Sequence, residues 1–226
     1  MSSKSLKSEY QKWLWMLATA DLIVVALFLL PGVGVGGDIA KLANWRLLTT
    51  VLVPIAVLLL VNVLPHKAKC MLVYWKPYGW MPGSEVFSKF APDDVRVDMK
   101  ALAKNVGQLP ETPRDQNTRW YQLYKLVENQ TEVAEAHRNF LMYRDMAVLS
   151  LAFAPLAPAG LYFAGASRGV QWLAAAAFAV QFVLTALSAR WSGVRFVCNV
   201  VALHSAKKIT GTGPARQPKR AAAPQA

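Results

Sequence analysis

Arginine and aromatic side chains recur along one charged stretch of the chain in a pattern that suits an anionic ligand. Guanidinium groups bind phosphate or carboxylate oxygens through paired hydrogen bonds, and aromatic rings stack on bases. The alternative is a surface helix that lies beside anionic headgroups, and no glycine-rich phosphate loop supports a nucleotide-binding fold. The candidate ligand- or partner-binding residues are Arg119, Trp120, Tyr124, His137, Arg138 and Arg144.

A cluster of aspartates, Asp93, Asp94 and Asp98, has a spacing that would suit Mg²⁺ at a membrane face. Such clusters serve enzymes that act on lipid diphosphates, where the metal neutralises phosphate charge. Acidic residues at a predicted helix start more commonly stabilise the exposed N–H groups there. The two cysteines and three histidines lack zinc-ligand spacing. We therefore assign no catalytic residue, no metal ligand and no cofactor.

Asp21 is an ionisable residue inside an apolar run, near the end of that run that we expect to face the cytoplasm. Charged groups inside a membrane span are costly and usually serve a function. At a similar depth, Asp21 can meet Asn62 of the next apolar run, or Thr185 and Ser188 of the last one. The alternative is a carboxylate close enough to the headgroups to remain hydrated. Asp21 and Asn62 are therefore our candidates for polar residues within the membrane.

The elements that position these residues are four apolar runs. The chain is 54% hydrophobic and only 17% charged, whereas soluble domains carry about 25% charged residues. A membrane-spanning helix needs about 20 apolar residues, and four runs meet this length. A cleaved signal peptide is the alternative for the first run, which is longer than a typical signal core. The predicted spans are residues 16–35, 47–64, 146–166 and 170–189.

Short loops join these spans into two hairpins, residues 16–64 and 146–189, with residues 65–145 between them. Lysine and arginine are scarce in the two short loops and abundant elsewhere, which accounts for the net charge of +12. Cytoplasmic loops carry such an excess. We therefore expect an all-α, multi-pass protein of the inner (plasma) membrane with both termini and residues 65–145 in the cytoplasm. The same explanation disfavours a nucleic-acid partner.

The segment 65–145 is predicted to be helical. A short helix over residues 93–106 should end at Gly107, where glycine suits a helix stop. A second helix, capped by Asn117 or Thr118, has no breaker before Asp145 and leads straight into the third span, which contains Pro155 and Pro158. If it is unbroken through Ala166, it is roughly 49 residues and about 70 Å long. Its apolar residues recur at steps of three and four. Either the same chain covers that stripe or a second copy does, and we expect a homo-oligomer.

The two ends of the chain are basic. Residues 1–15 should form a cytoplasmic N-terminus that leads into the first span. After the fourth span, the segment to residue 208 keeps helical character, and its apolar residues are flanked by lysine and arginine. This pattern predicts a helix that lies on, or leaves, an anionic inner leaflet. Within this C-terminal region, residues 190–226, the last part is rich in Gly, Pro and Ala and is predicted to be disordered.

This layout, four spans with a cytoplasmic helical insertion between the second and third, resembles the small four-helix membrane effectors of bacterial antiphage defence systems. The resemblance implies antiviral defence by a cytoplasmic region that senses a signal and spans that form a pore. We expect a non-catalytic, oligomeric membrane protein whose cytoplasmic segment binds a protein or nucleotide and controls the membrane part. The alternatives are a transporter or channel subunit, and a membrane enzyme acting on lipid-linked phosphate.

Overall fold

The computed structural model describes residues 6–29, 63–76 and 81–206, and all regular structure within these ranges is helical. Three helices are long and apolar enough to cross a membrane: α1 (Leu6–Leu29), α7 (Thr131–Phe163) and α8 (Arg168–Ala206). They contain residues 16–29 of the first predicted span, residues 146–163 of the third and all of the fourth, while residues 30–35 of the first lie outside the described residues. Asn62, most of the second predicted span and the first hairpin loop lie outside the described residues.

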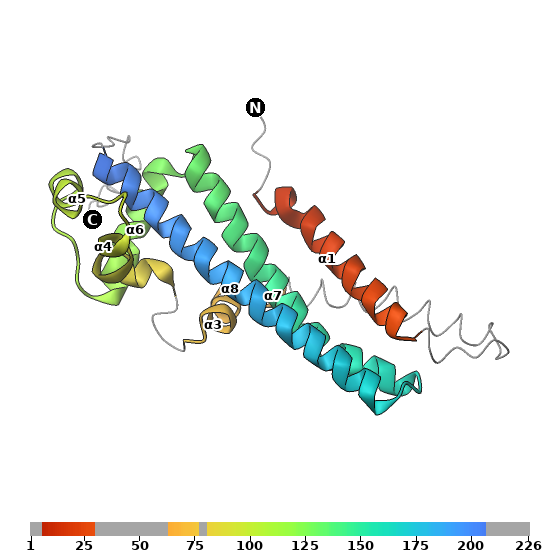
Figure 1. Cartoon of the computed structure of the whole chain (residues 1–226). Helices are drawn as coiled ribbons and strands as arrows, with labels where there is room; N and C mark the ends of the chain where they lie inside the picture. The colour runs from red at the N-terminus through yellow and green to blue at the C-terminus, as the bar shows by residue number, and fades with distance from the viewer. Residues whose placement is uncertain (1–5, 30–62, 77–80, 207–226) are drawn as a thin grey trace, which may run out of the picture.

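The helices α7 and α8 lie antiparallel and side by side, and α1 lies along α7 (Figure 1). The turn between α7 and α8 contains Gly165, whose φ of 76° is a conformation that glycine adopts without strain. α7 remains helical through Pro155 and Pro158. Because α7 and α8 are 33 and 39 residues long, both extend well beyond the length that a bilayer requires.

Apolar side chains hold the three long helices together. We call the buried cluster between them the three-helix core, and within it the rings of Phe153 and Phe178 stack with centroids 5.4 Å apart. The outer faces of these helices are apolar as well, with Leu27, Val180 and Leu184 all more than half exposed. An apolar surface on both sides of a helix suits a lipid environment. The three-helix core consists of Ala18, Val148, Leu149, Phe153, Ala157 and Phe178.

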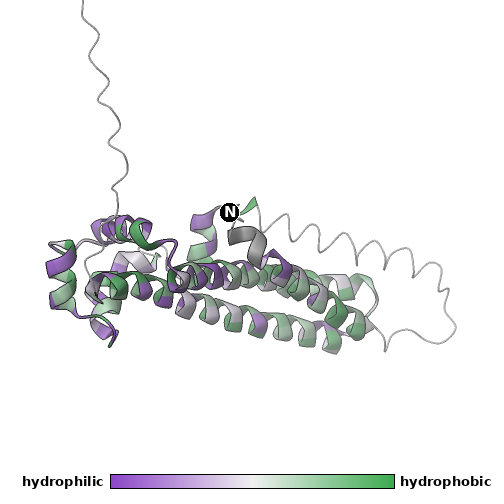
Figure 2. Ribbon diagram, turned by 90° about the horizontal axis from the view of Figure 1, so that it is seen from above, coloured by the Kyte–Doolittle hydropathy of each residue, from purple (hydrophilic) through white to green (hydrophobic). Residues whose placement is uncertain are grey.

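Most of the short helices lie beside the end of the pair where α7 begins and α8 finishes, and helix His66–Tyr74 lies nearer the middle (Figure 1). Hydrophilic residues are concentrated around the short helices, whereas the opposite ends of α7 and α8 are hydrophobic (Figure 2). We call this part the small-helix domain. Its elements are α3 (His66–Tyr74), the 3₁₀ turn η2 (Pro82–Glu85), the π-helical turn η3 (Val86–Phe90), α4 (Ala91–Asp93), α5 (Met99–Val106) and α6 (Pro113–Val127).

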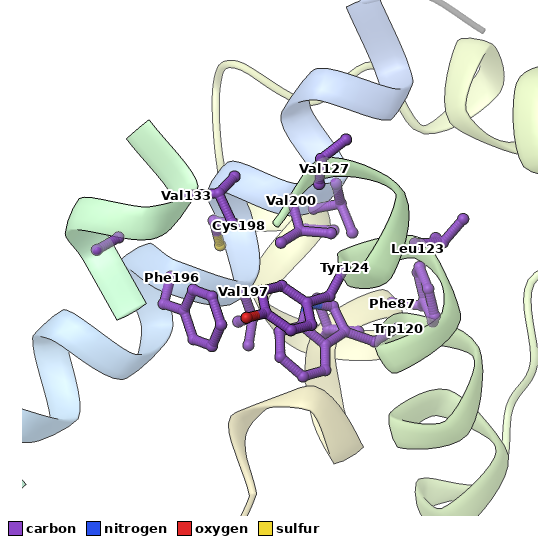
Figure 3. Close-up of a cluster of buried hydrophobic side chains, with 14 of the residues drawn as sticks. Phe87, Trp120, Leu123, Tyr124, Val127, Val133, Phe196, Val197, Cys198 and Val200 are labelled. Atoms are coloured by element: carbon purple, nitrogen blue, oxygen red, sulfur yellow. The ribbon is translucent and has the colours of Figure 1, made fainter. Parts of the chain in front are cut away.

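Aromatic rings from α6 and α8 lie at the centre of the small-helix domain (Figure 3), and α7 adds the ring of His137. Trp120 and Tyr124 stack with centroids 5.6 Å apart, and Phe196 of α8 meets both rings edge-on. The imidazole of His137 stacks on the ring of Phe196 at 4.5 Å and meets the ring of Tyr124 edge-on at 5.6 Å. Paired rings of this kind contribute beyond the area that they bury. We call Trp120, Tyr124, His137 and Phe196 the aromatic core.

The prediction of one unbroken helix from Asn117 to Ala166 was wrong. α6 begins at Pro113 after the cap residue Thr112, and the chain leaves helical geometry at residues 128–130 before α7 begins. This break turns α6 back against α8, where Trp120, Leu123 and Val127 become buried. A straight helix would have left this apolar face without a partner inside the chain. The stripe is therefore covered by the same chain, and it gives no reason to expect a second copy.

The short helix before α6 also starts later than predicted. Asp93 ends α4, and α5 begins only after Asp98, whose Oδ1 accepts hydrogen bonds from the backbone N–H groups of Lys100 and Ala101. Asp98 is thus the N-cap, because its carboxylate satisfies N–H groups that the helix leaves free. Gly107 ends the helix as predicted, with a φ of 87°.

The segment after the fourth predicted span does not form a separate helix. α8 continues without a break to Ala206, and Phe196, Val197, Val200 and Val201 are buried against the short helices. Their apolar side chains therefore contact protein, whereas the sequence had suggested an anionic leaflet. The side chain of Asn105 in α5 donates to the carbonyls of His204 and Ser205, which the helix end leaves free.

Candidate functional site

Asp145 lies at the centre of a buried ionic cluster where α1, α3 and α7 meet. Its Oδ1 accepts hydrogen bonds from Lys69 Nζ at 3.0 Å and from Arg144 Nε and Nη2 at 3.0 and 2.7 Å. Its Oδ2 accepts one from the Tyr10 hydroxyl at 3.2 Å. Arg144 Nη1 also contacts Nδ1 of His66. We call Tyr10, His66, Lys69, Arg144 and Asp145 the junction cluster.

The local geometry of α3 and α7 positions the side chains that these helices contribute to the junction cluster. α3 begins after Pro65, and the N–H of Lys69 donates to the carbonyl of Pro65. His66 and Lys69 are three residues apart, so they lie on one face of this helix. Arg144 and Asp145 are consecutive on α7, and the long arginine side chain turns back to its neighbour's carboxylate. The cluster lies beside the start of the predicted third span, at residue 146.

The junction cluster buries two cations against one carboxylate. Lys69, Arg144 and Asp145 are only 6%, 6% and 2% exposed. His66 is at an exposed position, but partial desolvation of its ring lowers the pKa of His66, and the positive charges of Arg144 and Lys69 lower it further. The formal charges of the three described side chains Lys69, Arg144 and Asp145 therefore sum to +1. Removing one partner of a buried ion pair costs about 3–5 kcal/mol, because the remaining charge is left uncompensated.

Two further contacts join α3 to α8. Arg190 Nε donates to the carbonyl of Val73 at 2.7 Å, and its guanidinium stacks 3.8 Å from the ring centre of Trp75. A cation is favourable at this place because the last carbonyls of a helix carry partial negative charge. Trp75 itself has the left-handed φ of 53°, which ends α3 at that point. α3 is thus held to both α7 and α8 by charged side chains.

A glycine in α8 permits the close packing beside this contact. A Cβ on Gly193 would lie 2.0 Å from the hydroxyl of Tyr74 and 3.1 Å from the ring of Phe140. Real Cβ atoms do not approach other atoms that closely, so only glycine fits. Gly193 is therefore the place where Tyr74 of α3 and Phe140 of α7 approach the backbone of α8 most closely.

Asp21 lies in the three-helix core, but its partners differ from those expected. Its Oδ1 accepts a hydrogen bond from Gln181 Nε2 at 2.8 Å, and that amide nitrogen also lies 3.2 Å from Ser150 Oγ. Thr185 and Ser188, the residues suggested by the sequence, donate to carbonyls of their own helix. The expectation that they meet Asp21 was therefore wrong, because helix hydroxyls readily bond to the preceding turn.

The predicted ligand-binding residues do not form one site. Trp120 and Tyr124 are buried in the aromatic core at 4% and 8% exposure. His137 stacks there on Phe196, and its Nδ1 lies 3.2 Å from the hydroxyl of Tyr124. These rings stabilise the small-helix domain, and a base has no access to the face of Trp120 that stacks on Tyr124.

The three predicted arginines are dispersed. Arg119 contacts the carbonyl of Val106 at the end of α5 and donates to Gln122. Arg138 lies 3.8 Å from Glu135 in the next turn of the same helix. Arg144 belongs to the junction cluster. Of the six candidate residues, only Arg144 belongs to the junction cluster.

The aspartates suggested for Mg²⁺ have other partners. Asp94 forms an ion pair with Arg96 at 2.7 Å, and this donor lowers the pKa of Asp94 to about 2. Asp98 caps α5, and Asp93 is exposed. In the ranges that the structure describes, no three Asp, Glu, His or Cys side chains gather as metal ligands would.

Sequence reasoning missed Tyr10, Lys69, Asp145 and Gln181. A usable signal existed for Asp145, which is the last charged residue before the apolar run of the third predicted span. A carboxylate at that depth requires a partner, just as Asp21 does. Nothing in the sequence indicated that Lys69 and Tyr10 are the partners of Asp145, because they lie 76 and 135 residues before it in the chain.

Comparisons with protein-family models, with curated proteins and with solved structures found no match to this chain.

Proposed function

We propose that this protein is a multi-pass protein of the inner membrane whose small-helix domain, in the cytoplasm, binds a partner or ligand and thereby controls the membrane helices. More specifically, we propose that it acts as a membrane-permeabilising effector of antiphage defence. In this proposal both termini are cytoplasmic, and the junction cluster lies at the cytoplasmic boundary of the bilayer. The observation that carries the proposal is that cluster, which connects α1, α3 and α7 through one carboxylate.

The continuity of two helices supports control over a distance. α7 contributes Phe140 to the core of the small-helix domain and Phe153 to the three-helix core, and α8 contributes Phe196 and Phe178 in the same way. Because a helix is a stiff element with a hydrogen bond at every residue, displacement of one end moves the other. A ligand that shifts the small-helix domain would therefore shift the bundle, provided that it binds the two arrangements with different affinity.

Permeabilisation requires a path through the membrane, and we propose that several copies form it together. The amphipathic stripe of α6 is unavailable for assembly because α8 covers it. The exposed apolar faces of α1 and α8, which include Ile23, Leu27, Val180 and Leu184, remain as contact surfaces for lipid or for a second copy. Assembly through these faces would place the interface within the bilayer.

The direct test is membrane potential in bacterial cells that express the protein from an inducible promoter, read with a voltage-sensitive dye. We expect wild-type protein to depolarise the cells. Lys69→Met removes the link between α3 and Asp145 but keeps Arg144 opposite Asp145, so we expect a folded protein with reduced depolarisation. Lys67→Met is the matched control, because Lys67 is exposed on the same helix. Normal potential at every expression level of membrane-inserted wild-type protein would overturn the effector proposal.

A transporter or channel subunit is the second candidate, and the burial of Asp21 favours it. Asp21 is 3% exposed and lies between α1, α7 and α8, where a carboxylate is costly unless it serves a function. Ion or proton flux into vesicles that contain the purified protein would test it, and we expect the flux to disappear in Asp21→Asn. We do not propose an enzyme acting on lipid-linked phosphate, because Asp94 is paired with Arg96 and Asp98 caps the N-terminus of α5.

A further inference from the structure

Among the residues that the structure describes, no hydrogen-bond donor reaches one of the two carboxylate oxygens of Asp21. Its Oδ2 is fully buried and unpartnered, and Oδ1 has the single donor Gln181 Nε2. The neighbouring groups are apolar, since Ala18, Val148, Leu149 and Phe178 belong to the same three-helix core and Leu22 packs against it. A carboxylate in such a place normally has two or three donors or an opposite charge.

The charges around Asp21 give no compensation. Among the residues that the structure describes, the polar groups that approach Asp21 from α7 and α8 are Ser150 and Gln181, and neither titrates. The nearest charged residue along α7 is Asp145, whose oxygens are bonded within the junction cluster. On α8 the nearest is Arg190, nine residues beyond Gln181, which bonds to Val73. No cation among these residues neutralises Asp21.

The free-energy costs of burying the ionised and the neutral carboxyl group show which form of Asp21 is favoured when α1 is packed against α7 and α8. An ionised carboxylate without a partner costs several kcal/mol in a buried site, even after the surroundings relax. A neutral carboxyl with one unmade hydrogen bond costs about 1–3 kcal/mol. The neutral form is therefore the less costly one in mildly acidic water, where binding the proton itself costs little. A bound metal cation is a weaker solution, because hard cations take about six oxygen ligands and the surrounding side chains supply few.

We propose that Asp21, with Gln181 and Ser150, is a proton-binding site in the membrane part of this protein. A proton from water binds to the carboxylate when α1 is packed against α7 and α8, and this packing loosens when the proton is lost. The proton joins Oδ2, and Gln181 Nε2 keeps its hydrogen bond to Oδ1. This inference rests on the membrane location proposed above, and it does not require that the protein permeabilise the membrane.

The test is infrared spectroscopy of the purified full-length protein in lipid nanodiscs, in which a protonated carboxyl has its own C=O stretching band. We expect wild-type protein to show this band in mildly acidic buffer and to lose it as the buffer becomes alkaline. Asp21→Asn should lack the band at every pH, and it should fold, because asparagine imitates the neutral carboxyl. Asp93→Asn, at an exposed position, is the matched control and should leave the band unchanged.

A second measurement follows the packing of α1. The thermal unfolding midpoint of wild-type protein should fall with rising pH through the range in which the band disappears, and Asp21→Asn should lose this part of the dependence. Three results would overturn the inference. They are a wild-type spectrum without the band at any pH, a band that persists in Asp21→Asn, and loss of the band at constant pH when sodium replaces choline. The last result would identify a metal-cation site instead. A normal band in a protein that does not depolarise cells would reject only the effector proposal.

Discussion

The charge count of the junction cluster predicts that two neighbouring substitutions differ sharply in their effect on stability. Asp145→Asn keeps the shape of the side chain but leaves the buried cations Lys69 and Arg144 facing each other, which raises the cluster from +1 to +2. Lys69→Met keeps an unbranched side chain of similar length and leaves one arginine opposite one carboxylate, which lowers the cluster to zero. The same three side chains are involved in both variants.

The expected magnitudes follow from burial. Asp145→Asn should cost about 3–5 kcal/mol of unfolding free energy, because among the described side chains it removes the carboxylate that faces both Lys69 and Arg144. Lys69→Met loses a charged hydrogen bond worth about 1.5–3 kcal/mol, but it also avoids burying an ammonium ion, so we expect about 1 kcal/mol or less. In a chain of this size 1 kcal/mol shifts Tm by about 2–4 °C. The predicted losses are therefore about 10 °C and about 2 °C.

The chain provides its own reporter for this measurement. Cys70 and Cys198 are its only cysteines, and both are buried in the core of the small-helix domain. Burial raises the pKa of Cys70 to about 11 and that of Cys198 to about 12, so neither thiol reacts readily while the protein is folded. A thiol-reactive fluorophore added to detergent-solubilised protein therefore reports unfolding as the temperature rises.

Lys67→Met is the control, because Lys67 is exposed on the same helix and should leave Tm nearly unchanged. The reasoning is refuted if Lys69→Met lowers Tm as much as Asp145→Asn does. Such a result would mean that the contact itself, and not the balance of buried charge, determines the stability of the junction.

Three more substitutions test the packing around the same helices. Trp120→Ala should cost about 3–5 kcal/mol by emptying the aromatic core, whereas its exposed neighbour Tyr121→Ala should change stability by less than about 0.5 kcal/mol; the thiol assay compares them. Gly193→Ala should cost about 1–3 kcal/mol because its methyl group collides with a hydroxyl, while Gly169→Ala, whose Cβ meets only one atom at 4.0 Å, should keep the wild-type Tm. Burial lowers the pKa of His137 to about 4, so the folded protein binds this proton less readily than the unfolded chain. Stability should fall as pH drops from about 6.5 toward 4, and His137→Gln should show a smaller fall in a pH series of Tm values.

The sequence alone determined the helical class and the location of three long apolar helices. A run of about 20 apolar residues can satisfy its backbone groups in lipid only as a helix, so length and composition are sufficient. Local chemistry was equally informative at Gly107, because a glycine beyond the last helical turn adopts the backbone angles that end a helix. Asp21 was identified as an intramembrane residue of interest for the same reason, since burial of an ionisable group is visible from its neighbours in the chain.

Only the tertiary structure decided which residues meet. From the sequence, the face of α6 that carries Trp120 could be covered by the same chain or by a second copy, and a break of three residues allows α8 to cover it. The partners of Asp145 come from α1 and α3, and the partner of Asp21 comes from α8, 160 residues further along the chain. The energy of such pairs depends on how the helices pack against each other. The residues next to each partner in the sequence do not predict that packing. The buried charges at the junction and in the three-helix core are therefore properties of the fold.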